Sequence, residues 1–213
     1  KLQAGFLAGE IMLNLDSEEF GAVYIGCAGG GDSTIKLPVS TVDAPAGTKG
    51  FVLRVSGLRG GHSGIDIIEQ RGNAIRILAR VLAAIVATQP CHVASVNGGS
   101  KRNAIPREAK AELMILETAV EDVSEIVGTL VEKIRIELGG REPDLAVTIV
   151  PADEPVTAVF DAATQKRVLD LLIAIPHGVE AMSYDIEGLV ETSNNLATVS
   201  TGGDAVTIGT STR

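Results

Sequence analysis

The chain has 213 residues and a mass of 22.1 kDa, which is enough for one large domain or two small ones. Its net charge of −9 argues against a nucleic-acid partner, because phosphate binding needs clustered Lys and Arg side chains. No apolar run approaches the roughly 20 residues that cross a bilayer, so we expect no membrane association. Aromatic residues make up only 3 % of the chain, and the core must therefore consist of aliphatic side chains.

The first 47 residues contain two short apolar runs and a linker. Residues 11–15 and 22–27 are each predicted to form a short buried strand, and the glycines at 29–31 then turn the chain away. The stretch "TVDAPAG" at 41–47 is typical of a linker because it contains a proline and a glycine. The two cysteines have no metal-binding spacing and are interpreted as buried thiols of a cytoplasmic protein.

Residues 51–150 alternate between strand and helix patterns. Apolar side chains recur every second residue in the predicted strands and every third or fourth residue in the predicted helices. The patterns predict, in order, a strand at 51–55, a helix at about 67–88 with regular spacing from 75, strands at 92–96 and 109–115, a helix at 123–138 and a strand at 145–150. This order predicts an α+β fold of the ferredoxin-like type, an antiparallel sheet with helices on one face.

The last quarter of the chain adds a helix and two strands. The helix is predicted at 158–175 and ends at Pro176. The strands, at 196–201 and 205–210, are joined by "GGD", which is typical of a hairpin.

The segment "GLRGGHSG" surrounds His62 with glycines immediately before a predicted helix. Such a loop leaves an imidazole exposed and lets a ligand approach the backbone. An imidazole donates a hydrogen bond to a carboxylate or to a developing oxyanion near neutral pH. The alternative is that Ser63 caps the helix and that the histidine is incidental. The other two histidines, His92 and His177, are interpreted as structural.

Two further segments carry candidate polar groups. Asp16 in "LNLDSEE" follows an apolar run, where ligand-binding groups emerge from a sheet, although the motif alone favours an acidic turn, because such turns are common. Asn103 in "NGGSKRNAIPRE" offers both a donor and an acceptor, although the segment taken alone favours a polar hairpin loop. Nucleotide-binding, nucleophile and metal-cluster motifs are absent from the sequence, and "GCAGGGDST" lacks the Lys of a phosphate-binding loop.

Five blocks occur in the order and spacing of one enzyme family. They are "LNLDSEE…GAVYIGCAGG", "GLRGGHSG", "NGGSKRNAIPREA", "GVEAMSYDIEGLVETSNN" and the closing "TSTR". On these blocks the chain resembles the aminoacyl-histidine dipeptidases, also called cytosolic non-specific or Xaa-His dipeptidases, within the di-zinc exopeptidases. The resemblance implies an α/β catalytic domain that binds two zinc ions and an inserted lid domain that mediates dimerisation. It implies that residues 1–47 are the end of a catalytic segment with its linker, and that 48–213 are the lid, incomplete at its C-terminus.

The same resemblance implies a role for four residues. Asp16 would be a zinc ligand, and His62 would contact the substrate and stabilise the oxyanion of the reaction. Asn103 would help to hold the substrate, and Arg213 would bind its C-terminal carboxylate, a pairing that guanidinium geometry favours.

The sequence departs from the family in its metal ligands. The family's H-x-D motif, bridging Asp and late His have no counterpart, and Glu18-Glu19 follow Asp16 directly, whereas the family's catalytic pair precedes that Asp. We therefore expect an interior fragment of a cytoplasmic, homodimeric dipeptidase that does not retain the zinc ions and is inactive alone. The alternatives are a self-standing binding or dimerisation module without catalysis, and a related di-zinc hydrolase of N-acyl amino acids or tripeptides.

Overall fold

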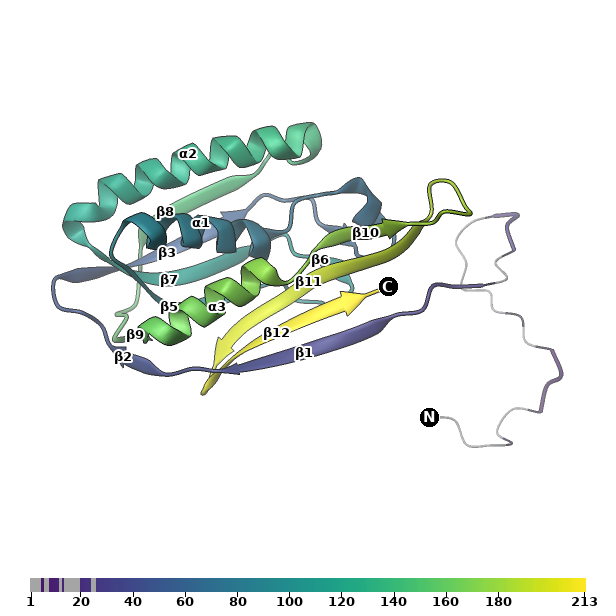
Figure 1. The fold of residues 1–213 in the computed structure, drawn as a ribbon, viewed down its shortest axis with the longest axis horizontal. Coiled ribbons are helices and arrows are strands. Elements are labelled where there is room, and N and C mark those ends of the chain that lie inside the picture. The colour runs from purple at the N-terminus through teal and green to yellow at the C-terminus, as the bar shows by residue number, and fades with distance from the viewer. Residues whose placement is uncertain (1–4, 6–7, 12, 14–19, 24–25) are drawn as a thin grey trace.

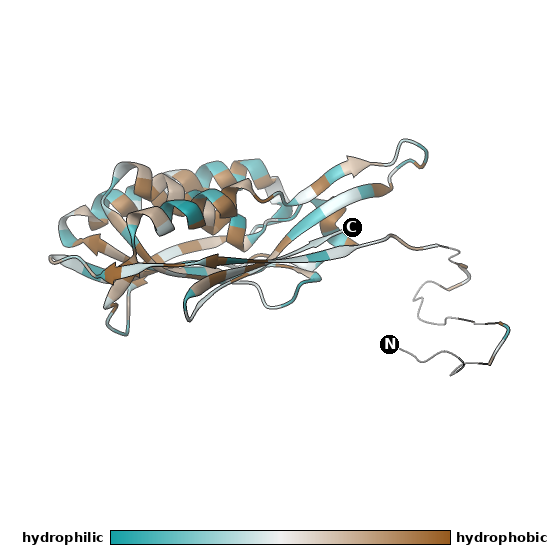
Figure 2. Ribbon diagram, turned by 60° about the horizontal axis from the view of Figure 1, so that its bottom comes forward, coloured by the Kyte–Doolittle hydropathy of each residue, from teal (hydrophilic) through white to brown (hydrophobic). Residues whose placement is uncertain are grey.

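The computed structural model describes residues 5, 8–11, 13, 20–23 and 26–213. From Gly31 onward the chain forms an antiparallel sheet with a layer of helices on one side (Figures 1 and 2). The strands of the main sheet lie in the order β1-β12-β11-β5-β7-β3-β8, and β10 pairs with β11. These strands are β1 (Gly31–Pro38), β3 (Thr48–Ser56), β5 (Cys91–Gly98), β7 (Ala109–Leu116), β8 (Ala146–Pro151), β10 (Gly178–Met182), β11 (Val190–Gly202) and β12 (Ala205–Thr212). The helices are α1 (Ala74–Thr88), α2 (Val120–Leu138) and α3 (Ala162–Ala174).

Half of this sheet is the predicted ferredoxin-like unit. The elements β3, α1, β5, β7, α2 and β8 follow one another in the predicted order, and their strands pair antiparallel in the order β5-β7-β3-β8. The α+β prediction and the placement of the helices on one face are confirmed. The helix expected from about residue 67 is shorter, because a separate 3-10 turn (Asp66–Glu69) precedes α1.

The core lies between the helices and the sheet, and it is mostly aliphatic, as the composition predicts, with two buried phenylalanines, Phe51 and Phe160. Leu78 and Leu82 of α1 are fully buried, as is Leu53 of β3. The helix begins where the Asn73 side chain accepts hydrogen bonds from the backbone N–H groups of Ile75 and Arg76, which the first turn otherwise leaves unpaired. None of the described helices has the length and apolarity of a membrane-crossing helix.

The other half of the sheet extends the unit with strands from both ends of the sequence. The predicted C-terminal hairpin is confirmed as β11 and β12, and β1 pairs with β12 over its whole length. A second, two-stranded sheet joins β2 (Thr41–Asp43) to β9 (Ala158–Phe160). The expected domain boundary between residues 47 and 48 stays a prediction, but two strands before it pair with strands that follow it.

The third helix starts later than the sequence predicts. The strand β9 occupies the first three residues of the expected helix, and Asp161 then caps α3 by accepting a hydrogen bond from the backbone N–H of Thr164 at 2.7 Å. The hydrogen bonds of Asp161 lower the pKa of its carboxyl. An aspartate at this position fixes the start of a helix because it satisfies an otherwise unpaired donor.

The N-terminal segment does not show the expected buried strands in its described residues. Ile11, Leu13 and Val23 lie outside any strand and are 83 %, 80 % and 88 % exposed. The expectation of two buried thiols is right for Cys91 and wrong for Cys27, which is exposed. Burial raises the pKa of the Cys91 thiol to about 12, because a thiolate loses its hydration in the apolar interior.

Candidate functional site

Two loops that lie more than 40 residues apart in the sequence form a small ladder and bring two of the expected site residues together. The strand β4 (Gly61–His62) pairs with β6 (Ala104–Ile105), and His62 lies opposite Ala104. The backbone N–H of Ser63 then donates to the backbone carbonyl of Asn103 at 2.9 Å. The glycine-rich loop and the basic loop are therefore one structural unit.

Local hydrogen bonds orient the His62 ring. The backbone N–H of Gly64 donates to His62 Nδ1 at 3.2 Å, so the neutral ring carries its hydrogen on Nε2. The backbone N–H of His62 donates to Asp66 Oδ2 at 2.7 Å. A side chain at Gly61 would meet that same carboxylate oxygen at 2.6 Å, and the φ of 148° disfavours any other residue. The alternative role of Ser63 as a helix cap is wrong, because its side chain caps no described helix.

Arg213 approaches the same unit from the end of β12. Its backbone N–H and carbonyl both bond with Ser193 of β11 at 2.9 Å, which continues the strand pairing to the end of the chain. Its guanidinium lies against Gly64, where a Cβ atom would come within 2.8 Å of Arg213 Nε. Arg213 and Asn103 also line one hollow of about 370 Å³, together with the exposed ion pair of Arg102 with Asp32 at 2.5 Å.

The polar interior of this unit is incompletely satisfied. Three buried polar atoms have no hydrogen-bond partner among the described residues: Ser63 Oγ, Asn195 Oδ1 and Arg213 Nε. A buried polar atom without a partner costs about 1–3 kcal/mol. Asn195 is only 1 % exposed, and its amide N–H groups donate to the backbone carbonyls of Arg102 and Ala104. Residue-by-residue interpretation of the sequence missed Asn195, although it lies within the block "VETSNN".

The chemistry of the three side chains is that of an anion-binding site. An imidazole Nε2–H, an amide and a guanidinium all donate hydrogen bonds, and a guanidinium pairs with a carboxylate through two parallel bonds. No described carboxylate forms an ion pair with Arg213. The hollow that Asn103 and Arg213 line therefore suits a ligand with a carboxylate group, and His62 lies in the adjoining ladder without lining that hollow.

The residues at hand do not fit a zinc centre. Asp16, the expected zinc ligand, lies outside the described residues. Within the part of the chain that the structure describes, no group of three or more His, Cys, Asp or Glu side chains could hold a metal ion. Structural and catalytic zinc sites need at least three protein ligands.

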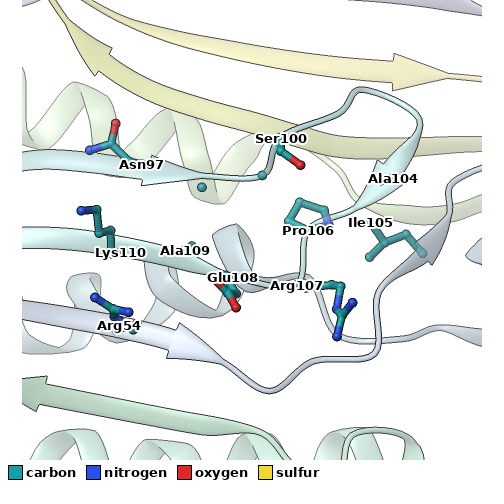
Figure 3. A pocket seen from close by; sticks show the side chains of 12 residues that line it. Arg54, Asn97, Ser100, Ala104, Ile105, Pro106, Arg107, Glu108, Ala109 and Lys110 are labelled. Carbon is teal, nitrogen blue, oxygen red and sulfur yellow. The ribbon is translucent and has the colours of Figure 1, made fainter.

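A larger hollow of about 600 Å³ lies beside the same basic loop but excludes the three site residues. Figure 3 shows Arg54, Lys110 and Asn97 along its wall, one from each of the neighbouring strands β3, β7 and β5. Arg54 lies directly opposite Lys110, and Lys110 directly opposite Asn97. Asn97 Oδ1 accepts from the backbone N–H of Thr201 at 3.0 Å, so this side chain ties β5 to β11.

The histidine His177 fits the structural role expected of it. Its Nδ1 lies 3.2 Å from the Asn73 amide nitrogen, beside the start of α1. Burial, together with the positive charge of Arg76, lowers the pKa of His177 to about 4, so its ring is neutral at pH 7.

The chain is similar to known proteins in its family, its sequence and its structure. Residues 53–142 match the family described as the peptidase dimerisation domain. The cytosol non-specific dipeptidase of Escherichia coli (strain K12) is 38 % identical over 198 residues, which are 93 % of this chain and 41 % of the relative. The crystal structure of aminoacylhistidine dipeptidase from Vibrio alginolyticus superposes with a TM-score of 0.89 at 38 % identity, over 100 % of this chain and 43 % of that one. The chain thus spans about two fifths of the length of these relatives.

Proposed function

Because the chain is homologous along nearly its whole length to cytosolic non-specific dipeptidases and contains a peptidase dimerisation domain, we propose that it is the substrate-binding and dimerisation part of a metal-dependent dipeptidase. The observation that carries the proposal is the convergence of His62, Asn103 and Arg213 from three separate segments. The substrate is a dipeptide, and the reaction is hydrolysis of its peptide bond in the cytoplasm.

Each of the three side chains has a role that its chemistry supports. Arg213 binds the C-terminal carboxylate of the dipeptide through its guanidinium, and Asn103 binds the peptide group. His62 donates from Nε2 to the oxygen that becomes negative when water attacks the carbonyl carbon. The bond from Gly64 to Nδ1 supports this role because it leaves Nε2–H free to face the substrate.

The metal centre of such an enzyme would supply the activated water, and it needs ligands beyond those that this chain's described residues offer. The two zinc ions, and Asp16 as a ligand of one of them, therefore stay proposals. We propose that the chain alone does not hydrolyse dipeptides. Incubation of the purified chain with Xaa-His dipeptides and zinc should release no amino acid above the rate of buffer, and measurable turnover would contradict the assignment.

The role of His62 is tested in the complete enzyme that contains this chain. His62→Ala should lower kcat by about 10²-fold or more, the usual effect of removing an oxyanion donor. The matched control is His92→Ala, which changes a half-buried histidine on β5 and should leave kcat unchanged. Equal kcat values for His62→Ala and wild type would mean that His62 is an incidental loop residue without a catalytic role.

Dimerisation is the second part of the proposal. The edge strand β8 has β3 on one side only, and Val150 on β8 and Ile136 on α2 are 46 % and 81 % exposed. An open edge with apolar neighbours favours pairing with a second copy. Light scattering should report a dimer for the chain and a monomer for Val150→Lys, whereas Ile173→Lys on α3 should remain dimeric. A monomeric wild-type chain would refute dimerisation through this domain.

Two alternatives make different predictions. A non-catalytic module would show no metal-binding segments elsewhere in the gene's reading frame, whereas the dipeptidase requires an H-x-D segment and a further histidine. A hydrolase of N-acyl amino acids or tripeptides would share these segments but would prefer those substrates to Xaa-His dipeptides when rates are compared on the complete protein.

A further inference from the structure

We propose that Asn195 is a positioning residue of the substrate pocket. Its side chain holds the Asn103 loop and the Arg213 guanidinium in a fixed position relative to one another. The inference rests on the proposed function for what the pocket binds, but its structural basis is independent of any substrate. Asn195 contacts no substrate itself and acts through its neighbours.

Asn195 holds the loop that presents Asn103. The backbone carbonyls of its residues 102–104 all accept hydrogen bonds. The Asn195 amide donates to the carbonyl of Arg102 at 3.1 Å and to that of Ala104 at 2.9 Å. The carbonyl between them, that of Asn103, accepts from Ser63 N–H at 2.9 Å. A single buried side chain thus fixes the backbone on both sides of Asn103, and it does so from a central strand of the sheet.

Arg213 follows β12, which is the neighbour of the strand β11 that carries Asn195. Asn195 lies opposite Ser211 in the β11–β12 ladder, and Ser193 is hydrogen-bonded to Arg213 through both backbone groups. Side chains two residues apart on a strand share a face, so Asn195 and Arg213 lie on the same face of the sheet, one step of the ladder apart. Asn195 Oδ1 is a buried acceptor without a partner, and Arg213 Nε is a buried donor without one. No direct hydrogen bond joins the two atoms, so their complementary character points to one bridging water through which Asn195 orients Arg213.

Only a carboxamide meets all of these requirements. Two donors for the two carbonyls, and one acceptor left over for a further donor, are the hydrogen-bonding groups of an Asn side chain. An Asp at this position would lose both donors and would place a charge against two carbonyl oxygens.

The neighbouring residue supplies a matched control. Asn194 is on the same strand and is 6 % exposed, but it faces the opposite side of the sheet. Its amide donates to the carbonyl of Pro176 at 2.6 Å, and its Oδ1 accepts from Thr212 Oγ1 at 2.8 Å. Asn194→Asp therefore introduces the same chemical change at similar burial without touching the Asn103 loop.

The first experiment measures amide hydrogen exchange in the 213-residue chain without substrate. Asn195→Asp should speed exchange of the Ser63 and Ala104 amides at least tenfold relative to wild type, which corresponds to the loss of one ordinary hydrogen bond. Asn194→Asp should leave both amides at the wild-type rate. Asn195→Ala, which buries no charge, gives the same comparison if the Asp variant does not fold. Unchanged exchange in the Ala variant, or equal acceleration in the Asn194 control, would overturn the proposal.

The second experiment measures dipeptide hydrolysis in the complete enzyme. Asn195→Ala should raise KM for dipeptides about tenfold, because both substrate-binding groups lose their support, and a purely structural residue would lower the amount of active enzyme with KM unchanged. Faster exchange with an unchanged KM would also overturn the positioning role. A complete protein without dipeptidase activity would refute the proposed function, and the exchange result alone would then decide whether Asn195 organises the loop.

Discussion

The interior beneath α1 and the polar junction where Ser63 and Asn195 contact the backbone of the Asn103 loop are equally buried but chemically opposite. Leu78 and Leu82 are 0 % exposed in a mostly aliphatic cluster, whereas Ser63 and Asn195 are 2 % and 1 % exposed close to backbone carbonyls and a guanidinium. Burial of apolar surface is non-directional and stabilises the fold in proportion to area. Buried polar groups contribute little net stability and depend on geometry. The first region therefore stabilises the fold, and the second defines the shape of a site.

The sharpest contrast comes from truncating the apolar interior. Leu78→Ala should lower the free energy of unfolding by about 3 kcal/mol, because it leaves a cavity under the central helix. Urea unfolding of the 213-residue chain measures this change. Ile173→Ala, at an exposed position on α3, should change it by less than about 1 kcal/mol. A similar small effect for both variants would mean that the layer under α1 is not the main source of stability.

The histidine His177 lies where the two regions meet, and it makes stability depend on pH. Its pKa is about 4 in the folded protein, below its ordinary value of 6.5, so the unfolded chain binds a proton first as the pH falls. Stability from this group is complete above pH 6.5 and is lost between about 6.5 and 4. The loss should be about 2 kcal/mol, somewhat less than the full shift implies, because the ring is partly exposed.

This pH dependence is measured as the difference between wild type and His177→Gln in urea unfolding at pH 7, 5.5 and 4.5. The glutamine cannot titrate, so carboxyl groups that protonate in both proteins cancel in the difference. If the two proteins lose stability in parallel, His177 is not the source of the pH dependence.

The smallest effect is expected at the junction itself. Ser63→Ala removes a buried hydroxyl that has no partner among the described residues, so the free energy of unfolding should stay the same or rise by about 0.5 kcal/mol. The measurement is again urea unfolding of the isolated chain. A fall of more than about 1 kcal/mol would show that the hydroxyl is satisfied in solution and that the junction resembles an ordinary hydrogen-bonded interior.

Several elements could be predicted because their signals are local. The period of apolar residues in α1 and α2 and the alternation in β3 and β7 each arise within a single segment, and capping residues such as Asp161 mark boundaries. The start of α3 was nevertheless placed too early, because Ala158–Phe160 forms a strand only when β2 is beside it. The strands β4, β6 and β10 went unpredicted for a similar reason. A two-residue strand has no periodicity, and β10 depends on its pairing with β11.

The residues of the candidate site likewise fall into those that the sequence indicated and one that it did not. The sequence indicated His62, Asn103 and Arg213 as candidates, through glycines around an imidazole and through family resemblance, but it could not indicate that Asn195 supports two of them. Asn195 and the Asn103 loop are about 90 residues apart, and their contact exists only when β11 passes beneath the loop.

The sequence by itself therefore determined the α+β order of the central elements, their amphipathic faces and the types of side chain available for binding, because these follow from local periodicity and composition. The tertiary structure alone decided that strands from both ends of the chain share one sheet, and that three segments distant in sequence come together, one of them held by a buried amide. Such contacts depend on register and on the pairing of segments remote in sequence, and no local pattern encodes either.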